Sequence, residues 1–284
     1  PKILFVTNEY FYNGTRINVL ERIPDIVKRI PSIKHIVITN YPGEPEIKKI
    51  PKYKNVKTYS WKYILEQKEI HLKFQKFDFE HELAILYSSG TTGKPKCICH
   101  KTGGVLLQHL KEHQLHCNIK ESDNVFYFTT CGWMMWNWLV SVLSSKASIV
   151  LFDGSPMYKK EDLLLKIANK EDITLFGVSA KYIDALRKTN INFKKKYKLS
   201  KLRTICSTGS PLSEDSFNYV YKNIKKDLHL ASISGGTDIV SCFVLGNLYQ
   251  PVYPGEIQNK GLGMDVRVFD ERGKSITDKK GELV

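Results

Sequence analysis

Residues 202–233 read LRTICSTGSPLSEDSFNYVYKNIKKDLHLASI, and this stretch decides the fold. An apolar run of strand length at 202–206 precedes a segment with helical spacing at 213–224, and a second strand-like run follows at 228–233. Ser213 is a residue type that caps the N-termini of helices. A strand, a helix and a strand in this order predict two parallel strands joined by a crossover helix.

The same alternation extends along most of the chain. Further strands are expected at 3–6, 36–39, 83–87, 125–129, 149–152 and 175–178, and further helices at 17–30, 105–115, 161–168 and 182–187. Pro24 is expected to break the first of these helices, and 41–60 is expected to be irregular. The pattern predicts an α/β fold with doubly wound, mostly parallel sheets covered by helices.

The domain organisation follows from where this pattern changes. We expect a partial N-terminal α/β subdomain at 1–80 and an α/β subdomain at 81–250. Helical spacing stops after about residue 250, so 251–284 is expected to begin a small β subdomain.

Composition excludes several classes of protein. The 284 residues are 42% hydrophobic and 11% aromatic, which argues against intrinsic disorder. The six cysteines include no C-x-x-C pair, which argues against structural zinc and for reduced thiols in the cytosol. The net charge of +14 has no nucleic-acid-binding motif beside it, so we expect small polyanionic substrates and no nucleic acid. No segment predicts stable membrane insertion or a signal peptide, and we expect a cytoplasmic protein.

The strongest chemical pattern is YSSGTTGKPK at 87–96, directly after a predicted strand. Its glycines allow close approach to an anion, its hydroxyls and backbone N–H groups can surround phosphate oxygens, and its lysines supply charge. It is not the usual P-loop, because Pro95 follows Gly93-Lys94 where that motif has Ser or Thr. A plain turn is the alternative, and ten such residues with two lysines disfavour it.

Residues 88–96, SSGTTGKPK, resemble the phosphate-loop motif of the acyl-adenylate-forming enzymes, which include acyl-CoA synthetases, luciferases and nonribosomal adenylation domains. Within that superfamily the chain is similar to the acetoacetate–CoA ligase family at 86–96, 130–137, 176–182 and 230–241, and more weakly over 1–80. The resemblance implies a ligase of lipid and fatty acid metabolism. ATP would activate acetoacetate as its acyl-adenylate, and coenzyme A would then take the acyl group, with Mg²⁺ as a cofactor.

Two other functions remain open beside this one. The chain could belong to another acyl-CoA or aryl-acid ligase, or be a truncated nucleotide-binding module without catalysis. Oligomeric state is left open.

The resemblance also implies roles for individual residues. Thr237 would face the α-phosphate, Asp238 would bind Mg²⁺ where the motif usually has Glu, and Lys96 would join them as a catalytic residue. The acyl pocket would involve Trp133, Met134, Met135 and Gly235, and Gly235 stands where acetyl-CoA synthetases have a Trp that closes the pocket. The implied nucleotide-binding residues are Ser88, Ser89, Gly90, Thr91, Thr92, Gly93, Lys94, Gly209, Ser210, Pro211, Ser232, Ile233, Ser234 and Gly236.

Several of these positions also have an ordinary structural interpretation. Residues 206–212 lie at a strand end before a helix, where open α/β sheets bind ligands, but a simple connection is equally plausible. Residues 132–138 hold three tryptophans, a pattern more typical of core packing. His109, His113 and His116 share a helical face with Lys111 and Glu112 nearby, which favours a solvated helix over a metal site, and His100 is expected to be structural.

The ends of the chain suggest a fragment. It begins at Pro1 without Met and stops at 281–284 in a strand-like run. By resemblance, a ribose-binding Asp, a hinge and a C-terminal lid domain with the adenylation Lys would follow. We therefore expect the central part of a synthetase that is inactive alone.

Overall fold

The computed structural model describes residues 1–41, 50–68, 71–88 and 93–284. It divides into two compact units, Pro1–Gln75 and Lys76–Val284, which are described separately. None of the helices among the described residues has the length and apolar character needed to cross a membrane.

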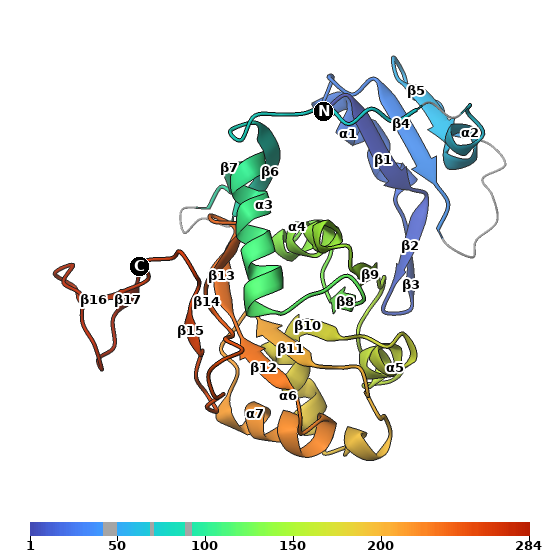
Figure 1. Ribbon diagram of the computed structural model, residues 1–284. Coiled ribbons are helices and arrows are strands. Elements are labelled where there is room, and N and C mark those ends of the chain that lie inside the picture. Colours follow the sequence, from blue (N-terminus) through green and yellow to red (C-terminus); the bar gives the residue numbers. More distant parts are fainter. Residues whose placement is uncertain (42–49, 69–70, 89–92) are drawn as a thin grey trace. The chain divides into compact units, whose positions relative to one another are not determined.

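The second unit is built on a five-stranded parallel sheet (Figure 1). Its order is β12-β11-β10-β8-β9. The strands are β8 (Asn124–Tyr127), β9 (Ser148–Val150), β10 (Leu175–Ser179), β11 (Thr204–Thr208) and β12 (His229–Ser232). The helices between them are α4 (Met134–Ser141), α5 (Leu163–Lys170), α6 (Ala180–Lys188) and α7 (Glu214–Tyr219). The Ser213 hydroxyl accepts a hydrogen bond from the backbone N–H of Ser216 and caps α7, so the predicted crossover is confirmed.

Helices cover both faces of this sheet because successive strand residues point to opposite sides. Phe126, Phe176 and Leu230 pack into one buried cluster with α5, α6 and α7. Tyr127 and Cys206, each next in sequence to a residue of the first cluster, pack into a second cluster with α4. Because both faces are buried, apolar residues occupy successive positions within these strands, and the α/β prediction is confirmed.

The other strands of this unit and α3 lie outside the five-stranded sheet (Figure 1). They are the hairpin β6 (Glu82–Ser88) and β7 (Lys96–Lys101), α3 (Thr102–Lys111) with a π-helical turn at Glu112–His116, the antiparallel β13 (Ser234–Gly236), β14 (Ser241–Leu245) and β15 (Asn259–Lys260), and the pair β16 (Val268–Phe269) and β17 (Glu282–Leu283). Ser88 pairs with Lys96, so the first and last residues of the phosphate-loop segment lie opposite each other in this hairpin.

The first unit holds a three-stranded parallel sheet of order β1-β4-β5. Its elements are β1 (Ile3–Thr7), a hairpin of β2 (Glu9–Tyr12) and β3 (Thr15–Asn18), α1 (Ile23–Arg29), β4 (His35–Thr39), β5 (Lys57–Ser60) and α2 (Trp61–Leu65).

Two local expectations for the first unit were wrong. The helix expected at 17–30 is confined to α1, because residues 17–18 belong to β3, and Pro24 does not interrupt α1 but lies in its first turn, where its missing N–H has no intrahelical partner to lose. The region expected to be irregular contains β5, which pairs with β4.

Candidate functional site

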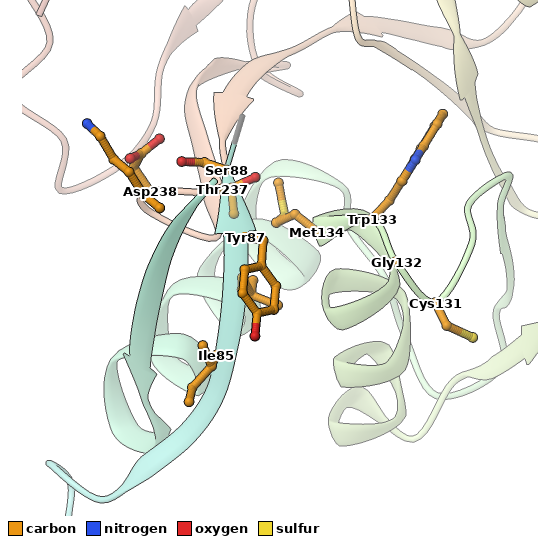
Figure 2. A pocket seen from close by; sticks show the side chains of 11 residues that line it. Ile85, Tyr87, Ser88, Cys131, Gly132, Trp133, Met134, Thr237 and Asp238 are labelled. Atoms are coloured by element: carbon orange, nitrogen blue, oxygen red, sulfur yellow. The ribbon is translucent and has the colours of Figure 1, made fainter. Parts of the chain in front are cut away.

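A cleft of about 740 Å³ lies between the β6–β7 hairpin, the start of α4 and the turn after β13 (Figure 2). Its lining residues are Ile85, Leu86, Tyr87, Ser88, Lys96, Cys131, Gly132, Trp133, Met134, Thr237 and Asp238. Ser88 and Lys96 come from paired positions at the mouth of the hairpin, whereas Thr237 and Asp238 come from a segment about 140 residues later. The fold therefore collects hydroxyls, one ammonium group and one carboxylate into one cleft.

The phosphate-loop residues are only partly described. Ser89, Gly90, Thr91 and Thr92 lie outside the described residues. Gly93 has a φ of 96°, a backbone conformation that favours glycine. Lys94 is exposed, and of the two loop lysines only Lys96 lines the cleft.

The turn that carries Thr237 and Asp238 is held at both of its ends. The backbone N–H of Val240 donates to the Thr237 carbonyl at 3.2 Å, and His100 Nε2 donates to the same carbonyl at 2.8 Å. His109 Nε2 donates to the Val240 carbonyl at 2.6 Å. Val240 itself has a φ of 50°, and the left-handed region costs a β-branched residue roughly 1–2 kcal/mol. The turn is thus a strained backbone segment fixed by two imidazoles.

A second cavity of about 390 Å³ adjoins the cleft, with Trp133, Met134 and Thr237 in both walls. All four residues predicted to form the acyl pocket line it. The complete lining is Tyr127, Phe128, Trp133, Met134, Met135, Ser179, Lys181, Thr208, Gly209, Ser210, Gly235, Gly236, Thr237, Ser241 and Cys242. Apolar side chains and the missing side chain of Gly235 leave room here for a short aliphatic group.

Gly235 has a second structural reason to be glycine. It pairs with Cys242 across β13 and β14, and a Cβ atom at Gly235 would lie 2.0 Å from the Ser241 carbonyl oxygen. Any side chain at this position therefore requires β14 to move, in addition to filling the cavity.

A third cavity of about 350 Å³ shares Thr208, Gly209, Ser210 and Gly235 with the second. Of the predicted nucleotide residues, it brings together Gly209, Ser210, Pro211, Ser232, Ile233 and Ser234. Gly209 has a φ of 85° immediately after β11, so the chain turns sharply at the carboxyl end of that strand. Gly236 lies in the wall of the second cavity and not of the third.

Several residues that line the second cavity were not predicted from the sequence. Ser179 ends β10 and Lys181 lies in the first turn of α6, and both residues line the second cavity. The strand-end rule that drew attention to 206–212 applies equally to β10, so the pattern was present. Ser241 and Cys242 had no comparable pattern, because only their pairing with Gly235 and Gly236 brings them to the cavity.

The oxygen donors of the cleft suit a magnesium ion. In the described part of the chain no group of three or more His, Cys, Asp and Glu side chains is arranged to hold a metal. Mg²⁺ is commonly bound by one or two carboxylates together with substrate phosphates, so a dedicated protein cage is unnecessary. Asp238 is exposed in the cleft beside the Thr237 hydroxyl, which fits that mode of binding.

The histidine-bearing face of α3 is buried, so the expectation of a solvated helix was wrong. His109, Glu112 and His113 are fully buried and His116 is 4% exposed. Burial lowers the pKa of His109, and it lowers the pKa of His113 to about 3. His116 is held by Nδ1 donating to the Gly246 carbonyl at 2.8 Å. All three imidazoles are bound to backbone carbonyls, and they form no metal site.

The chain is similar to several proteins that are named acetoacetyl-CoA synthetase. The acetoacetyl-coenzyme A synthetase of Rhizobium meliloti (strain 1021) is 48% identical over 284 residues, and the acetoacetyl-CoA synthetase of Gallus gallus is 44% identical over 287 residues. Each alignment covers 100% of this chain and 43% of the relative. The solved structure of acetoacetyl-CoA synthetase from Streptomyces lividans matches with a TM-score of 0.89 at 36% identity, covering 100% of this chain and 43% of that one.

The chain therefore spans less than half the length of these relatives. The family model described as AMP-binding enzyme matches residues 1–284, and on that match the chain belongs to the AMP-binding enzyme family.

Proposed function

We propose that the protein is an acid–thiol ligase that uses ATP to convert acetoacetate to its acyl-adenylate and then to its coenzyme A thioester. The observation that carries this proposal is the set of three adjoining cavities, one with phosphate-type ligands, one apolar and one at the carboxyl end of β11. The relatives that are named acetoacetyl-CoA synthetases support acetoacetate as the acid.

Each cavity has a role in this proposal. Ser88, Lys96 and Thr237 bind the ATP phosphates in the cleft. A phosphate-binding role for the loop residues 89–94 is supported by the sequence motif. Met134, Met135 and Gly235 enclose the aliphatic part of the acid, with Trp133 at the boundary between cleft and cavity. Gly209, Ser210 and Pro211 lie along the adenine, and Ser232, Ile233 and Ser234 complete that wall. Gly236 lies in the wall of the acyl cavity, next to Thr237.

The chemistry requires alignment and charge neutralisation. The acid's carboxylate attacks the α-phosphorus and pyrophosphate leaves, so negative charge accumulates on phosphate oxygens. Lys96 places a cation beside that charge, and the Thr237 hydroxyl donates to a phosphate oxygen. Asp238 would hold Mg²⁺, which supplies further positive charge to the phosphates. Lys181 faces the acyl cavity and attracts the acid's carboxylate. A cytosolic location is part of the proposal and is supported by six free cysteines.

Acid-dependent exchange of pyrophosphate into ATP tests this function. The protein is produced at the full length of its open reading frame and supplied with MgATP and a panel of acetate, butyrate, acetoacetate, octanoate and benzoate. We expect acetoacetate to give the highest kcat/KM. A clear preference for octanoate or benzoate would identify a different acid ligase, and nucleotide binding without exchange for any acid would identify a binding module.

A further inference from the structure

The polar face of α3 and its π-helical turn binds the backbone of the segment that follows β13. His109 Nε2 donates to the Val240 carbonyl at 2.6 Å. The buried Glu112 carboxylate accepts from the Cys242 backbone N–H at 3.0 Å and also from the Ser241 hydroxyl. These contacts join residues about 130 positions apart in the sequence.

The same face also binds α4, whose first residues line the acyl cavity. Trp138 Nε1 donates to Glu112 Oε2 at 2.9 Å, and His113 Nε2 donates to the Trp138 carbonyl at 3.1 Å. His109 Nδ1 lies 2.7 Å from Ser141 Oγ. One helix face therefore fixes both the turn that carries Thr237 and Asp238 and the helix that carries Met134 and Met135.

The position of α3 in the sequence, directly after the phosphate-loop hairpin, explains what this arrangement does. His100 and His109 both come from the segment directly after the phosphate loop, β7 and α3. They bind the first and last carbonyls of the turn, those of Thr237 and Val240. The turn is thus positioned relative to the phosphate-loop hairpin, which contributes Ser88 and Lys96 to the same cleft.

We propose, resting on the adenylation function proposed above, that His109 is a positioning residue that holds Val240 in its left-handed conformation and so aims Thr237 and Asp238 at the bound phosphates. His109 touches neither substrate nor reacting atoms. An apolar side chain at this position would leave the buried Val240 carbonyl without its donor, and the strained φ at Val240 would relax. A displacement of about 1 Å at groups that align the reaction reduces rates by as much as ~10²-fold.

The test compares the full-length wild type with His109→Leu, His109→Gln, Val240→Gly and the double variant His109→Leu with Val240→Gly. His71→Leu is the matched control, because His71 is exposed and lies outside the network. Gln places an N–H donor at a similar distance from the backbone, and glycine adopts positive φ without strain. The measurements are kcat and the KM for acid and MgATP in pyrophosphate exchange, the MgATP affinity by calorimetry, and the folded fraction.

We expect His109→Leu to lower kcat at least tenfold while the KM for the acid changes less than threefold. His109→Gln should recover activity to within threefold of the wild type. Replacing His109 by Leu in the Val240→Gly variant should reduce kcat less than threefold, because glycine no longer needs the restraint. His71→Leu should match the wild type.

Two results would overturn the inference. One is a His109→Leu enzyme within twofold of the wild-type kcat. The other is a loss of kcat on His109→Leu that is equal with and without the Val240→Gly substitution, that follows the folded fraction, and that His109→Gln does not recover. If the wild type exchanges pyrophosphate with none of the acids, the proposed function fails instead. His109 is then judged by calorimetry alone, and MgATP affinities of His109→Leu and wild type within threefold of each other reject the inference.

Discussion

Lys96 should contribute to ATP binding independently of the other residues that line the cleft. Lys96 lies opposite Ser88 in the hairpin and lines the cleft, whereas Lys101 is exposed at the other end of β7. A charge-assisted contact to phosphate contributes roughly 1.5–3 kcal/mol. Lys96→Ala should therefore weaken ATP binding about tenfold or more, measured by calorimetry on the full-length protein. Lys101→Ala should leave the affinity unchanged, and an equal effect of both substitutions would remove Lys96 from the phosphate site.

Gly235 and Gly104 give a matched pair of glycines. A Cβ at Gly235 would meet the Ser241 carbonyl at 2.0 Å, while a Cβ at Gly104 on α3 would have nothing within 4 Å. Overpacking of this kind typically costs about 1–3 kcal/mol, whereas alanine in an exposed helix gains roughly 0.5–1 kcal/mol over glycine. Gly235→Ala should lower the free energy of unfolding in urea and Gly104→Ala should raise it. A neutral Gly235→Ala would mean that β14 has room to move.

Among the elements, the parallel strands are anchored at the end opposite the site. Arg203 precedes β11 and Asp123 precedes β8, and their side chains form two hydrogen bonds of 2.8 Å each. Asp123 is 2% exposed and also accepts from the Lys120 backbone N–H at 2.8 Å. Burial alone would raise the pKa of Asp123, but the Arg203 guanidinium and the Lys120 N–H lower it overall.

Breaking the pair of Asp123 and Arg203 should lower the free energy of unfolding and leave kcat unchanged. Removing one partner of a buried pair costs roughly 3–5 kcal/mol, so Asp123→Asn should destabilise the protein by an amount at the lower end of that range, since Arg203 is partly exposed. Glu121→Gln is the control, because its ion pair with Lys146 is exposed on both sides. Urea unfolding and kcat are measured on the same preparations. A kcat that falls more than twofold in folded Asp123→Asn would show that the two ends of the sheet are coupled.

How far the sequence predicts these elements depends on where their partners lie. The strands of the five-stranded sheet contain short apolar runs that are buried on both faces, and they were predicted to within a few residues. The β2–β3 hairpin was missed although Asn13-Gly14 is the strongest short hairpin pattern, and both residues have positive φ. The buried face of α3 was not predictable from local spacing, because the carbonyls that satisfy His109 and His116 belong to residues 240 and 246.

The candidate site was predictable to a similar extent. Local motifs identified Ser88, Lys96, Thr237 and Asp238, and the structure brings these four into one cleft. Lys181 follows the carboxyl end of β10, where the strand-end rule could have identified it, whereas Ser241 reaches the acyl cavity through its pairing with Gly236 and no local pattern distinguishes it.

For the molecule as a whole, buried histidines set the response to acid. Burial lowers the pKa of His109 and His229, and it lowers the pKa of His113 to about 3. In the unfolded chain each titrates near pH 6.5, so below that pH the unfolded state binds more protons than the folded state. The stability that these groups contribute is present above pH 6.5 and is lost as pH falls toward their folded pKa values.

Stability should therefore decrease from about pH 6.5 downward, well before the carboxylates titrate. Each such histidine contributes about 1.4 kcal/mol per pH unit between its two pKa values. The free energy of unfolding from urea titrations at pH 7.5, 6.5, 5.5 and 4.5 measures the slope. His113→Gln should make the slope shallower by about one proton. A wild-type stability that stays flat down to pH 5 would contradict the burial of neutral imidazoles.

The long sequence separation within the α3 network has a consequence for biosynthesis. Glu112 leaves the ribosome about 130 residues before Cys242, its backbone partner. At roughly 5–20 residues per second, this face of α3 waits on the order of 6–26 s for the strand that covers it. An apolar face would form non-native hydrophobic contacts with other segments of the nascent chain during that interval. The side chains of Gln108, His109, Glu112 and His113 are polar and remain well hydrated. Polar side chains on this buried surface thus limit non-native apolar contacts of the growing polypeptide until the segment that contains Cys242 has been synthesised.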